Sequence, residues 1–418
     1  MRNMKRVVIT GMGAITPIGN NIDEFAEGLK QGKSGADYIT HFDASSFKTT
    51  FACEVKGFNG DDIFGRKESR KMDLFSQYGL VAAREAIEDS DLDFTNEDTE
   101  RIGVIWGSGI GGLRSLEEQI ENNSDYEDTP RYNPFMIPKM IADIVPGLIS
   151  IEYGLRGLNY GTISACASSS NAIISAMDSI RMGRADVIIA GGSEAAVTRA
   201  GIGGFSGMKA LSSRNDDPAT ASRPFDKDRD GFVLGEGGGA LILEEYERAV
   251  ARGAKIYAEI LGGGMTADAY HITAPHPEGQ GAARVMREAL NDANVSVSKI
   301  DYLNVHGTST PLGDVAEIQA TLEVFGQHAY DLHISSTKSM TGHLLGASGV
   351  IETIACILAM RDEFIPPTIN HFTDDPEIDT KLQLTFNEAQ EALVHYAVCN
   401  TFGFGGHNTS LVLKKFVP

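Results

Sequence analysis

Short apolar runs rich in β-branched residues alternate along the chain with longer segments whose apolar residues recur at helical spacing. The runs that predict strands lie at Arg6–Thr10, Ile102–Trp106, Asp186–Ala190, Ala240–Leu243, Tyr257–Leu261, Tyr302–Val305, Ala397–Asn400 and Ser410–Lys414. Runs of this length are typical of buried strands, and the segments between them predict helices that cover the sheet. The pattern therefore predicts an α/β protein with mixed sheets covered by helices.

The clearest helical segment lies over Ser169–Met182. Its apolar residues fall on one face, at spacings of three and four: Ile173, Ala176, Met177 and Ile180. Gly183 supplies the stop, because glycine accepts the left-handed backbone that ends many helices. The run Ala185–Gly192 predicts the next strand, so this stretch is a helix between two strands.

The second half of the chain repeats the order of elements in the first half. Each half contains a strand end, a helix and a glycine-rich strand region, at Thr162–Cys166, Ser169–Met182 and Phe232–Leu243 in the first, and at Ile334–Lys338, Leu344–Met360 and Val394–Leu413 in the second. We interpret the repeat as a degenerate duplication with its seam near Ala258. It divides the chain into residues 1–258 and 259–418.

Stacking of two such halves has a consequence for the chemistry. Both helix starts would meet at one pseudo-symmetric centre. The repeat therefore predicts that Cys166, from the first half, lies near Lys338 and His343 from the second.

The composition is that of a globular protein with full-sized cores, because 42% of its 418 residues are hydrophobic. Lys and Arg number 36 and Asp and Glu 57, so the formal net charge is −21, which repels nucleic acid and anionic membranes. No apolar run approaches the roughly 20 residues of a membrane span, and glycine and proline interrupt the apolar start too soon for a signal peptide. The four cysteines have no CxxC or disulfide-dense spacing, which favours a reducing cytosol.

Cys166 stands between a strand-like run and the start of the long predicted helix. A thiol in the first turn of a helix faces unpaired N–H groups and the positive end of the macrodipole, and both favour the thiolate. The small neighbours Ala165 and Ala167 leave room for a substrate. The alternative is a small buried hydrophobic residue, but the histidine and lysine segments downstream favour a nucleophile.

Two histidines and a lysine form the second candidate group. His306 follows a predicted strand on a rigid loop, and His343 follows Lys338 closely in sequence. The helix beyond is apolar nearly all round, so Glu352 is predicted to be buried, and a buried carboxylate requires a cation. Lys338 is the natural partner. We expect the pair to orient His343 and to keep its imidazole neutral.

The segment Asn400–Asn408 predicts a glycine-rich turn between two strands, with Phe404 held between Gly403 and Gly405. A ring with glycine on both sides can swing. An ordinary hairpin loop with one buried ring would have the same sequence, and the residues alone leave both alternatives open.

Three local motif matches are rejected. Gly107–Gly112 fits the GxGxxG of dinucleotide sites, but no acidic strand end for a ribose follows it. Asp226–Gly231 imitates the start of a calcium loop, but the twelfth position is Gly237 rather than glutamate. Ser335–Lys338 spells SxxK, but its serine lies within a predicted strand and the companion motifs are absent.

A basic cluster at Arg66–Lys71 stands out in this acidic chain. Lys67, Arg70 and Lys71 fall on one side of a predicted helix, while the apolar residues that follow point inward. The cluster predicts a local positive face on which an acidic protein partner could dock.

Taken together, these segments resemble the β-ketoacyl–acyl carrier protein synthases, specifically the elongating type II enzymes of bacterial fatty acid synthesis, which belong to the thiolase-like superfamily. The resemblance covers essentially the whole chain and rests on motifs at Val8–Gly13, Thr162–Ser170, Ser222–Asp226, Asp230–Glu236, His306–Pro311, Lys338–His343 and Asn400–Gly406. It implies a thiolase-like α/β fold, in which duplicated βαβαβαββ halves form a five-layered αβαβα architecture.

The resemblance also implies a reaction. Cys166 would take an acyl chain from a carrier-protein thioester, with backbone N–H groups of Cys166 and Phe404 stabilising the oxyanion. Decarboxylation of malonyl-carrier would then give an enolate, stabilised by N–H donors of neutral His306 and His343, which condenses with the acyl chain.

Supporting roles follow from the same resemblance. Lys338 and Glu352 would fix His343 and the local field, and Phe404 would act as a gate that admits malonyl after acylation. Pocket or loop positions would be Ile110, Phe205, Asp268, Thr273, Gly403 and Gly405. Docking positions for the acidic carrier would be Lys67, Arg70, Lys71, Arg131 and Lys209.

The resemblance further implies a cytoplasmic homodimer that uses acyl carrier protein as partner, with no cofactor and no metal. Two other enzyme classes remain to be compared. A polyketide-type ketosynthase has the same catalytic residues. A thiolase needs a second cysteine as base, and Cys399 is the candidate for that role.

Overall fold

The computed structural model describes residues 4–123 and 131–417. Ten strands of the described residues form a mixed sheet in the order β10-β9-β13-β14-β8-β1-β7-β6-β4-β5. In chain order they are β1 (Val7–Ile15), β4 (Ile102–Gly107), β5 (Asn159–Thr162), β6 (Val187–Glu194), β7 (Gly237–Glu245), β8 (Ala258–Ala267), β9 (Tyr302–Asn304), β10 (His333–Ser335), β13 (Tyr396–Gly403) and β14 (His407–Lys415). Each predicted strand is confirmed, with bounds shifted by a few residues.

The sheet consists of two halves with the same topology. In the first half the order β1-β7-β6-β4-β5 has two antiparallel and then two parallel pairings, and β8-β14-β13-β9-β10 repeats both the order and the directions. The halves join where β1 pairs with β8, at Val8–Glu259 and Ile9–Ala258. We keep the division at residue 258 as an interpretation of this repeat.

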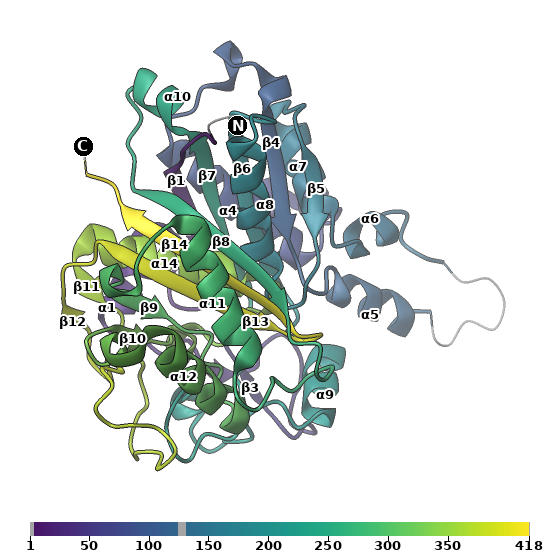
Figure 1. The fold of residues 1–418 in the computed structure, drawn as a ribbon. Coiled ribbons are helices and arrows are strands. Elements are labelled where there is room, and N and C mark those ends of the chain that lie inside the picture. The colour runs from purple at the N-terminus through teal and green to yellow at the C-terminus, as the bar shows by residue number, and fades with distance from the viewer. Residues whose placement is uncertain (1–3, 124–130, 418) are drawn as a thin grey trace.

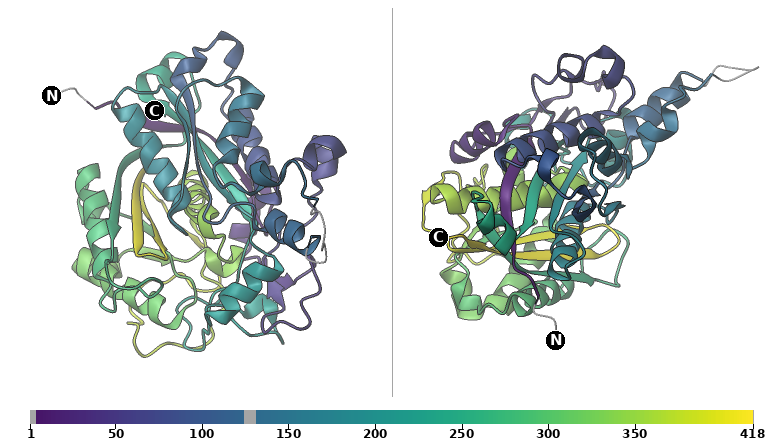
Figure 2. Two further views of the ribbon diagram at one scale, coloured as in Figure 1. Left: turned by 90° about the vertical axis from the view of Figure 1, so that its right-hand side faces the viewer. Right: turned by 90° about the horizontal axis from the view of Figure 1, so that it is seen from above.

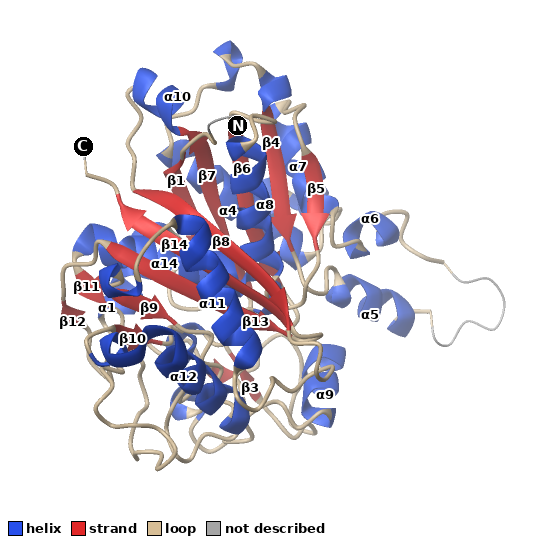
Figure 3. Ribbon diagram, in the orientation of Figure 1, coloured by secondary structure: helices blue, strands red, loops and turns tan. Residues whose placement is uncertain are grey.

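Two helices lie between the halves of the sheet (Figures 1 and 3). They are α8 (Ser168–Arg181), which packs on β4 and β6 and reaches β8 and β14, and α14 (Ser348–Asp362), which packs on β13 and β7. All residues of α14 from Ser348 to Met360 are buried, as expected for a helix that is apolar all round. These two helices form the central layer.

The outer faces of the sheet are covered by separate helices (Figure 2). In the first half these are α4 (Leu74–Asp89) and α7 (Ile144–Tyr153), and in the second half they are α11 (Gln280–Ala293) and α12 (Pro311–Phe325). The order of layers is therefore helix, sheet, helix, sheet, helix. This confirms the predicted thiolase-like αβαβα architecture with duplicated halves.

Shorter elements complete the described chain. They are α1 (Ile22–Lys30), β2 (Asp37–Tyr38), β3 (Phe51–Ala52), α2 (Gly60–Phe64), α3 (Arg66–Ser69), α5 (Leu113–Glu121), α6 (Met136–Met140), α9 (Arg199–Gly207), α10 (Tyr246–Ala251), α13 (Lys338–Thr341), β11 (Phe364–Ile365) and β12 (Gln390–Glu391). In Figure 1, α5 and α6 stand away from the layered body on the side of β4 and β5. Within the described ranges, no helix combines the length and the apolar character that a bilayer crossing requires.

Two predicted helices have different bounds in the structure. The basic cluster does not lie on one continuous helix, because α3 ends at Ser69 and Asp73 begins α4 by accepting a hydrogen bond from the Phe75 N–H. The second-half helix begins at Ser348 rather than Leu344. Leu345 has a left-handed backbone (φ 47°), which interrupts the helix and makes a tight turn after His343.

The strand ends bring the chemical groups together. Cys166 lies between β5 and α8, His306 follows β9, and Lys338 follows β10. These strands are parallel members of the two halves, so their carboxyl ends point towards the same central region, where α8 and α14 begin. Because the two halves have the same topology, the loops at the carboxyl ends of these strands meet at one site.

Candidate active site

Cys166 lies in a strained elbow between β5 and α8. The preceding residue, Ala165, has a left-handed backbone with φ 51°, which is costly for a residue with a side chain. The Ser168 hydroxyl holds this turn, because it accepts from the Ser164 N–H (2.9 Å) and donates to the Ala165 carbonyl (2.7 Å). The serine-rich stretch after the cysteine thus fixes the elbow that presents the sulfur.

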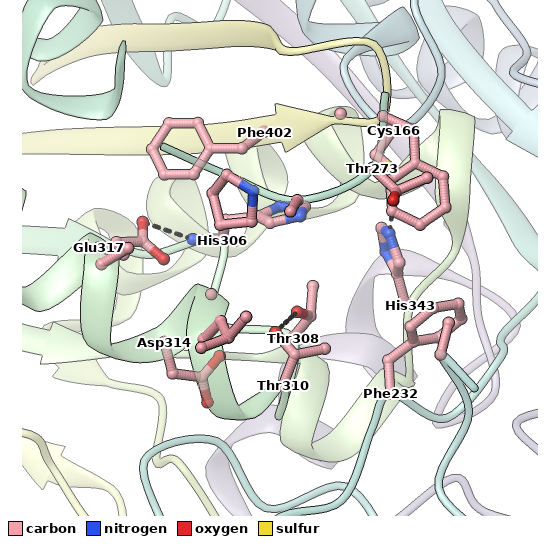
Figure 4. Close-up of a pocket in the computed structure, with 18 of the residues that line it drawn as sticks. Cys166, Phe232, Thr273, His306, Thr308, Thr310, Asp314, Glu317, His343 and Phe402 are labelled. Atoms are coloured by element: carbon pink, nitrogen blue, oxygen red, sulfur yellow. Dashed lines mark hydrogen bonds between the residues drawn. The ribbon is translucent and has the colours of Figure 1, made fainter. Parts of the chain in front are cut away.

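His343 faces the sulfur directly. Its Nε2 lies 3.0 Å from Cys166 Sγ, and its Nδ1 lies 2.9 Å from the Ser348 hydroxyl at the start of α14. The Phe232 ring packs edge-on against the imidazole, with the two ring centroids 5.2 Å apart. Figure 4 shows His343 and Cys166 pointing towards each other across one end of the cavity. The serine hydroxyl can donate or accept, so it can pair with either tautomer of the ring.

His306 is the second imidazole of the site. Its backbone N–H and that of Gly307 donate to the Glu317 carboxylate of α12, at 2.9 and 2.8 Å. These two hydrogen bonds tie the loop after β9 to α12. The centroid of the His306 ring lies 5.3 Å from that of the His343 ring, and the two rings are nearly perpendicular. It lies 5.6 Å from the centroid of the Phe402 ring. Both imidazoles therefore border one small volume next to the sulfur (Figure 4).

Both histidines are held in the neutral form. Burial lowers the pKa of His306 and of His343 well below the ordinary 6.5, and the nearby positive charge of Lys338 lowers both pKa values further. A neutral imidazole has one N–H donor and one acceptor nitrogen. Both shifts favour the uncharged rings that are expected at the site.

Lys338 and Glu352 form the buried pair that the sequence predicts. Lys338 Nζ donates to Glu352 Oε1, and Thr401 Oγ1 donates to the other carboxylate oxygen at 3.5 Å. Burial raises the pKa of Glu352 to about 7, and the lysine opposes that rise. One part of the expectation is wrong: the Ser348 hydroxyl, not the Lys338–Glu352 pair, orients the His343 ring. Lys338 acts on His343 through its charge.

The protonation state of Cys166 differs from the sequence expectation. Burial raises the pKa of this thiol to about 12, although the charge of Lys338 and the Phe404 N–H act in the opposite direction. The favourable helix start is outweighed, because the sulfur is almost fully removed from water. Cys166 therefore rests as a thiol, and the nearest proton acceptor is Nε2 of His343.

The glycine loop between β13 and β14 closes over the elbow. A side chain at Gly403 would come within 2.8 Å of the Ser164 carbonyl and 3.2 Å of the Cys166 N–H nitrogen, so only glycine allows this approach. The loop is joined to the 268–273 segment by hydrogen bonds from the Gly405 N–H to the Ile272 carbonyl and from the Asp268 N–H to the Gly406 carbonyl. The N–H of Phe404 faces the sulfur.

A cavity of about 380 Å³ surrounds the sulfur and both imidazoles. The residues predicted from the sequence that line it are Cys166, Phe205, Lys209, Asp268, Thr273, His306, His343, Gly403 and Phe404. Lys338 and Glu352 lie behind this lining. Gly405 is exposed at the turn, and Ile110, 39% exposed, lies outside the cavity in the single chain.

The basic residues occupy a separate surface depression. Lys67, Arg70, Lys71 and Arg131 line it together with Tyr132 and Phe135, and no carboxylate occurs among its described lining residues. Lys71 also pairs with Glu68 at 2.8 Å. Lys209 lies elsewhere, at the mouth of the active-site cavity.

Sequence reasoning missed four residues of the site: Phe232, Glu317, Ser348 and Phe402. A signal existed for Glu317, because it stands among the apolar Val315, Ala316 and Ile318 in sequence, as Glu352 stands among apolar residues of α14. Ser348 reaches the site through the turn after His343, and Phe232 and Phe402 reach it from segments that are distant in sequence. No local pattern marks them.

The chain matches two protein-family models. Beta-ketoacyl synthase, N-terminal domain, matches residues 4–249, and Beta-ketoacyl synthase, C-terminal domain, matches residues 257–372. The 3-oxoacyl-[acyl-carrier-protein] synthase 2 of Synechocystis sp. is 50% identical over 412 residues, which cover 99% of this chain and 98% of that protein. The protein of the same name from Staphylococcus aureus is 49% identical over 416 residues, covering both chains completely.

Solved structures give the same result. A Beta-ketoacyl synthase from Burkholderia phymatum has a TM-score of 0.91 and 37% identity, and the match covers 99% of this chain and 100% of that one. A type II PKS acyl-carrier protein in complex with its ketosynthase, bound to the hexaketide, matches with a TM-score of 0.89, 32% identity and coverage of 99% and 100%. Because the family models cover most of the chain and these relatives match it from end to end, the protein is a member of the β-ketoacyl synthase family.

Proposed function

We propose that this protein catalyses the decarboxylative Claisen condensation of malonyl-acyl carrier protein with an acyl chain held on Cys166. The products are 3-oxoacyl-acyl carrier protein and carbon dioxide, as in fatty acid elongation. One observation supports this above all: Cys166 Sγ and Nε2 of a neutral His343 lie 3.0 Å apart in a cavity that the neutral His306 also lines. The names of the full-length relatives point to the same reaction.

The first half-reaction is acyl transfer to the thiol. His343 Nε2 takes the thiol proton while the sulfur attacks the thioester carbonyl, and the carbonyl oxygen gains negative charge. The N–H groups of Cys166 and Phe404 stabilise that oxyanion. The bond between the carbonyl and the carrier's sulfur then breaks, the carrier thiolate takes the proton from His343, and the acyl chain remains on Cys166.

The second half-reaction begins with decarboxylation. The bond between the malonyl carboxylate and its neighbouring carbon breaks, carbon dioxide leaves, and the electron pair moves into an enolate whose charge lies on the thioester oxygen. N–H donors on His306 and His343 stabilise this oxygen. Because both rings are neutral, each has one N–H to donate, and the Ser348 hydroxyl accommodates the tautomer that places it on His343 Nε2.

Condensation completes the reaction. The enolate carbon attacks the acyl carbonyl, a carbon–carbon bond forms, and the bond to Cys166 breaks. Carbon dioxide leaves without charge, so the negative charge of the carboxylate passes through the enolate to the Cys166 thiolate, and one proton from solution restores the thiol. Phe404, on a glycine turn in contact with the 268–273 segment, acts as the gate that admits malonyl after the cysteine is acylated.

Two related enzyme classes fit less well. A thiolase requires a second cysteine beside the nucleophile, but Cys399 lies outside the cavity lining and its sulfur contacts Thr353 and Cys356. A polyketide-type ketosynthase has the same catalytic residues. Fatty acid elongation is favoured because the 3-oxoacyl synthase relatives are 49–50% identical, whereas the polyketide complex is 32% identical.

The partner we propose is acyl carrier protein, which delivers both acyl groups as thioesters on its phosphopantetheine arm. No other cofactor or metal is required by the steps above. The depression lined by Lys67, Arg70, Lys71 and Arg131 gives an acidic carrier a positive surface on a chain whose net charge is −21. Lys209 is the basic residue at the cavity mouth, where the arm would enter.

We also propose a homodimer that forms along β5, at the edge of the sheet (Figure 1). Exposed apolar side chains lie on or next to this strand: Ile110, Ile151, Tyr160 and Ile163. An unpaired edge strand with such a surface favours pairing with a second copy. Pairing would also cover Ile110 and bring it into an acyl pocket shared between subunits. A cytoplasmic location fits the absence of disulfide-dense cysteine spacing in the sequence.

Replacement of the nucleophile and of one imidazole separates the half-reactions. We expect Cys166→Ala to abolish acyl transfer but to retain part of the malonyl decarboxylation, and His343→Ala to lower decarboxylation about 100-fold or more. Carbon dioxide release from malonyl-carrier and mass spectrometry of the acylated protein measure the two steps. His395→Ala, at an exposed position, is the control. Full condensation by the cysteine variant would refute the assignment.

The lowered pKa values of His306 and His343 predict that neither ring takes up a proton between about pH 8 and pH 6. A histidine with an ordinary pKa near 6.5 is about three-quarters protonated at pH 6, whereas a ring with a depressed pKa stays neutral until the pH falls below its own value. We therefore expect the ring NMR signals of His306 and His343 to keep their positions between about pH 8 and pH 6. Single variants assign the signals, and a midpoint near 6.5 for either ring contradicts the neutral-donor mechanism.

Charge reversal in the basic depression tests carrier docking. We expect Arg70→Glu to raise the apparent KM for acyl-carrier roughly tenfold, with kcat changed less than twofold, because docking precedes the chemistry. The matched control is Lys299→Glu, the same charge change at an exposed position before β9. An unchanged KM in the Arg70 variant rules out this surface as the docking site.

A charge placed beside β5 tests the dimer. We expect sedimentation to give twice the chain mass of 44.9 kDa for the natural protein and the single-chain mass for Ile163→Asp, because a buried unpaired carboxylate opposes association. Leu393→Asp introduces the same charge at an exposed apolar residue of the other half and should leave the dimer intact. A natural protein that sediments as one chain excludes the dimer.

A further inference from the structure

Glu194, the last residue of β6, is a fully buried carboxylate outside the mechanism described above. Its relative exposure is 0%, and none of the ion pairs of the described residues includes it. Instead it accepts hydrogen bonds from the Ser108 hydroxyl (3.1 Å) and from the N–H groups of Gly109 (2.7 Å), Ile110 (3.2 Å), Gly111 (3.3 Å) and Gly346 (3.1 Å). An isolated buried carboxylate is costly, so these donors are what make its position tenable.

The donors come from two segments that are far apart in sequence. Four belong to the loop after β4, the glycine-rich stretch that imitates a dinucleotide motif, and one belongs to the turn between His343 and α14. The N–H groups that would bind a phosphate in a dinucleotide site are therefore bound to the protein's own carboxylate. A side chain at Gly346 would approach the Gly109 nitrogen to 2.2 Å, so the two segments touch around Glu194.

Both segments border the nucleophile. Leu345, next to Gly346, lines the cavity beside Cys166 in a left-handed backbone conformation. A side chain added at Gly109 would lie 3.2 Å from the Ala165 carbonyl, so the loop after β4 rests on the elbow itself. The family resemblance implies an acyl-pocket role for Ile110, the next residue, which lies outside the cavity of the single chain.

The backbones of both histidines are anchored separately from Glu194, and only the contact of the His343 ring with Ser348 lies near the Leu345–Gly346 turn. The His343 N–H donates to the Val233 carbonyl (2.7 Å), and the Gly235 N–H donates to the His343 carbonyl (2.9 Å). His306 is held by Glu317. None of these contacts passes through Glu194, so displacement of its two segments need not move either imidazole backbone.

We propose that Glu194 is a positioning residue for the acyl-transfer half-reaction. It holds the Ser108–Gly111 loop, which rests on the elbow at Ala165, and the Leu345–Gly346 turn, whose Leu345 lines the cavity beside Cys166. The inference rests on the proposed function. Glu194 touches no reacting atom. Its role is to fix the shape of the acyl-binding space, and with it the acyl chains that are accepted.

The test compares the two half-reactions in one preparation of Glu194→Gln. The amide keeps the size of the side chain but sets an NH₂ group against N–H donors, which leaves buried donors unpaired. We expect acylation of Cys166 by acyl-carriers to fall about tenfold or more and its preferred chain length to change. Carbon dioxide release from malonyl-carrier alone should stay within about threefold of the natural protein.

Glu244→Gln is the matched control. Glu244 is equally buried, but it lies on β7 opposite Val187, at the other end of β6, where it pairs with Arg248 and Arg252. We expect this variant to lower the melting temperature without changing the ratio of the two half-reactions. If Glu194→Gln does not fold, Ser108→Ala, which removes one donor of the same cluster, should change the ratio in the same direction by a smaller factor.

The outcomes are distinguishable. Equal losses in both half-reactions, or unchanged acylation with the natural chain-length profile, overturn the role of Glu194. A natural protein that is never acylated on Cys166 instead overturns the proposed function, whatever the variants do.

Discussion

The buried ammonium group of Lys338 acts on the pKa values of the ionisable groups around the cavity. It lowers the pKa values of His306 and His343, opposes the burial-driven rise of the Cys166 pKa, and does the same for Glu317 and Glu352. A buried cation is tolerable only with a bound carboxylate, and α14 supplies Glu352 from the central layer. Lys338 therefore sets the field in which the sulfur and both imidazoles work.

That electric field and the burial of the site together decide which group carries the proton, the Cys166 sulfur or the His343 imidazole. A helix start favours a thiolate, but Cys166 is too deeply buried for the effect to prevail. In the proposed mechanism its proton therefore passes to a base. His343 can be that base because it is neutral, and it can be a donor later for the same reason. The Ser348 hydroxyl suits both states, since it pairs with either nitrogen tautomer.

Buried carboxylates that bind backbone N–H groups recur at the edges of the site. Glu317 holds the loop after β9 and Glu194 holds the loop after β4, which is the equivalent strand of the other half. In each case the loop at the carboxyl end of a parallel strand lacks partners for its N–H groups, and an acidic side chain supplies them. The duplicated fold therefore uses the same kind of anchor twice, once for the loop after β4 and once for the loop after β9.

The sequence by itself determined the strands, the order of elements in both halves, and the pairing of Glu352 with Lys338, because apolar periodicity and the cost of a buried charge are local properties of the chain. It also singled out Cys166 and His306, which follow strand ends, and His343, which follows Lys338 closely in sequence. It did not determine the protonation of Cys166, the partner of the His343 ring, or the roles of Glu317 and Glu194. Those depend on how deeply a group is buried and on which distant segments meet it, and the stacking of the two halves alone decides both.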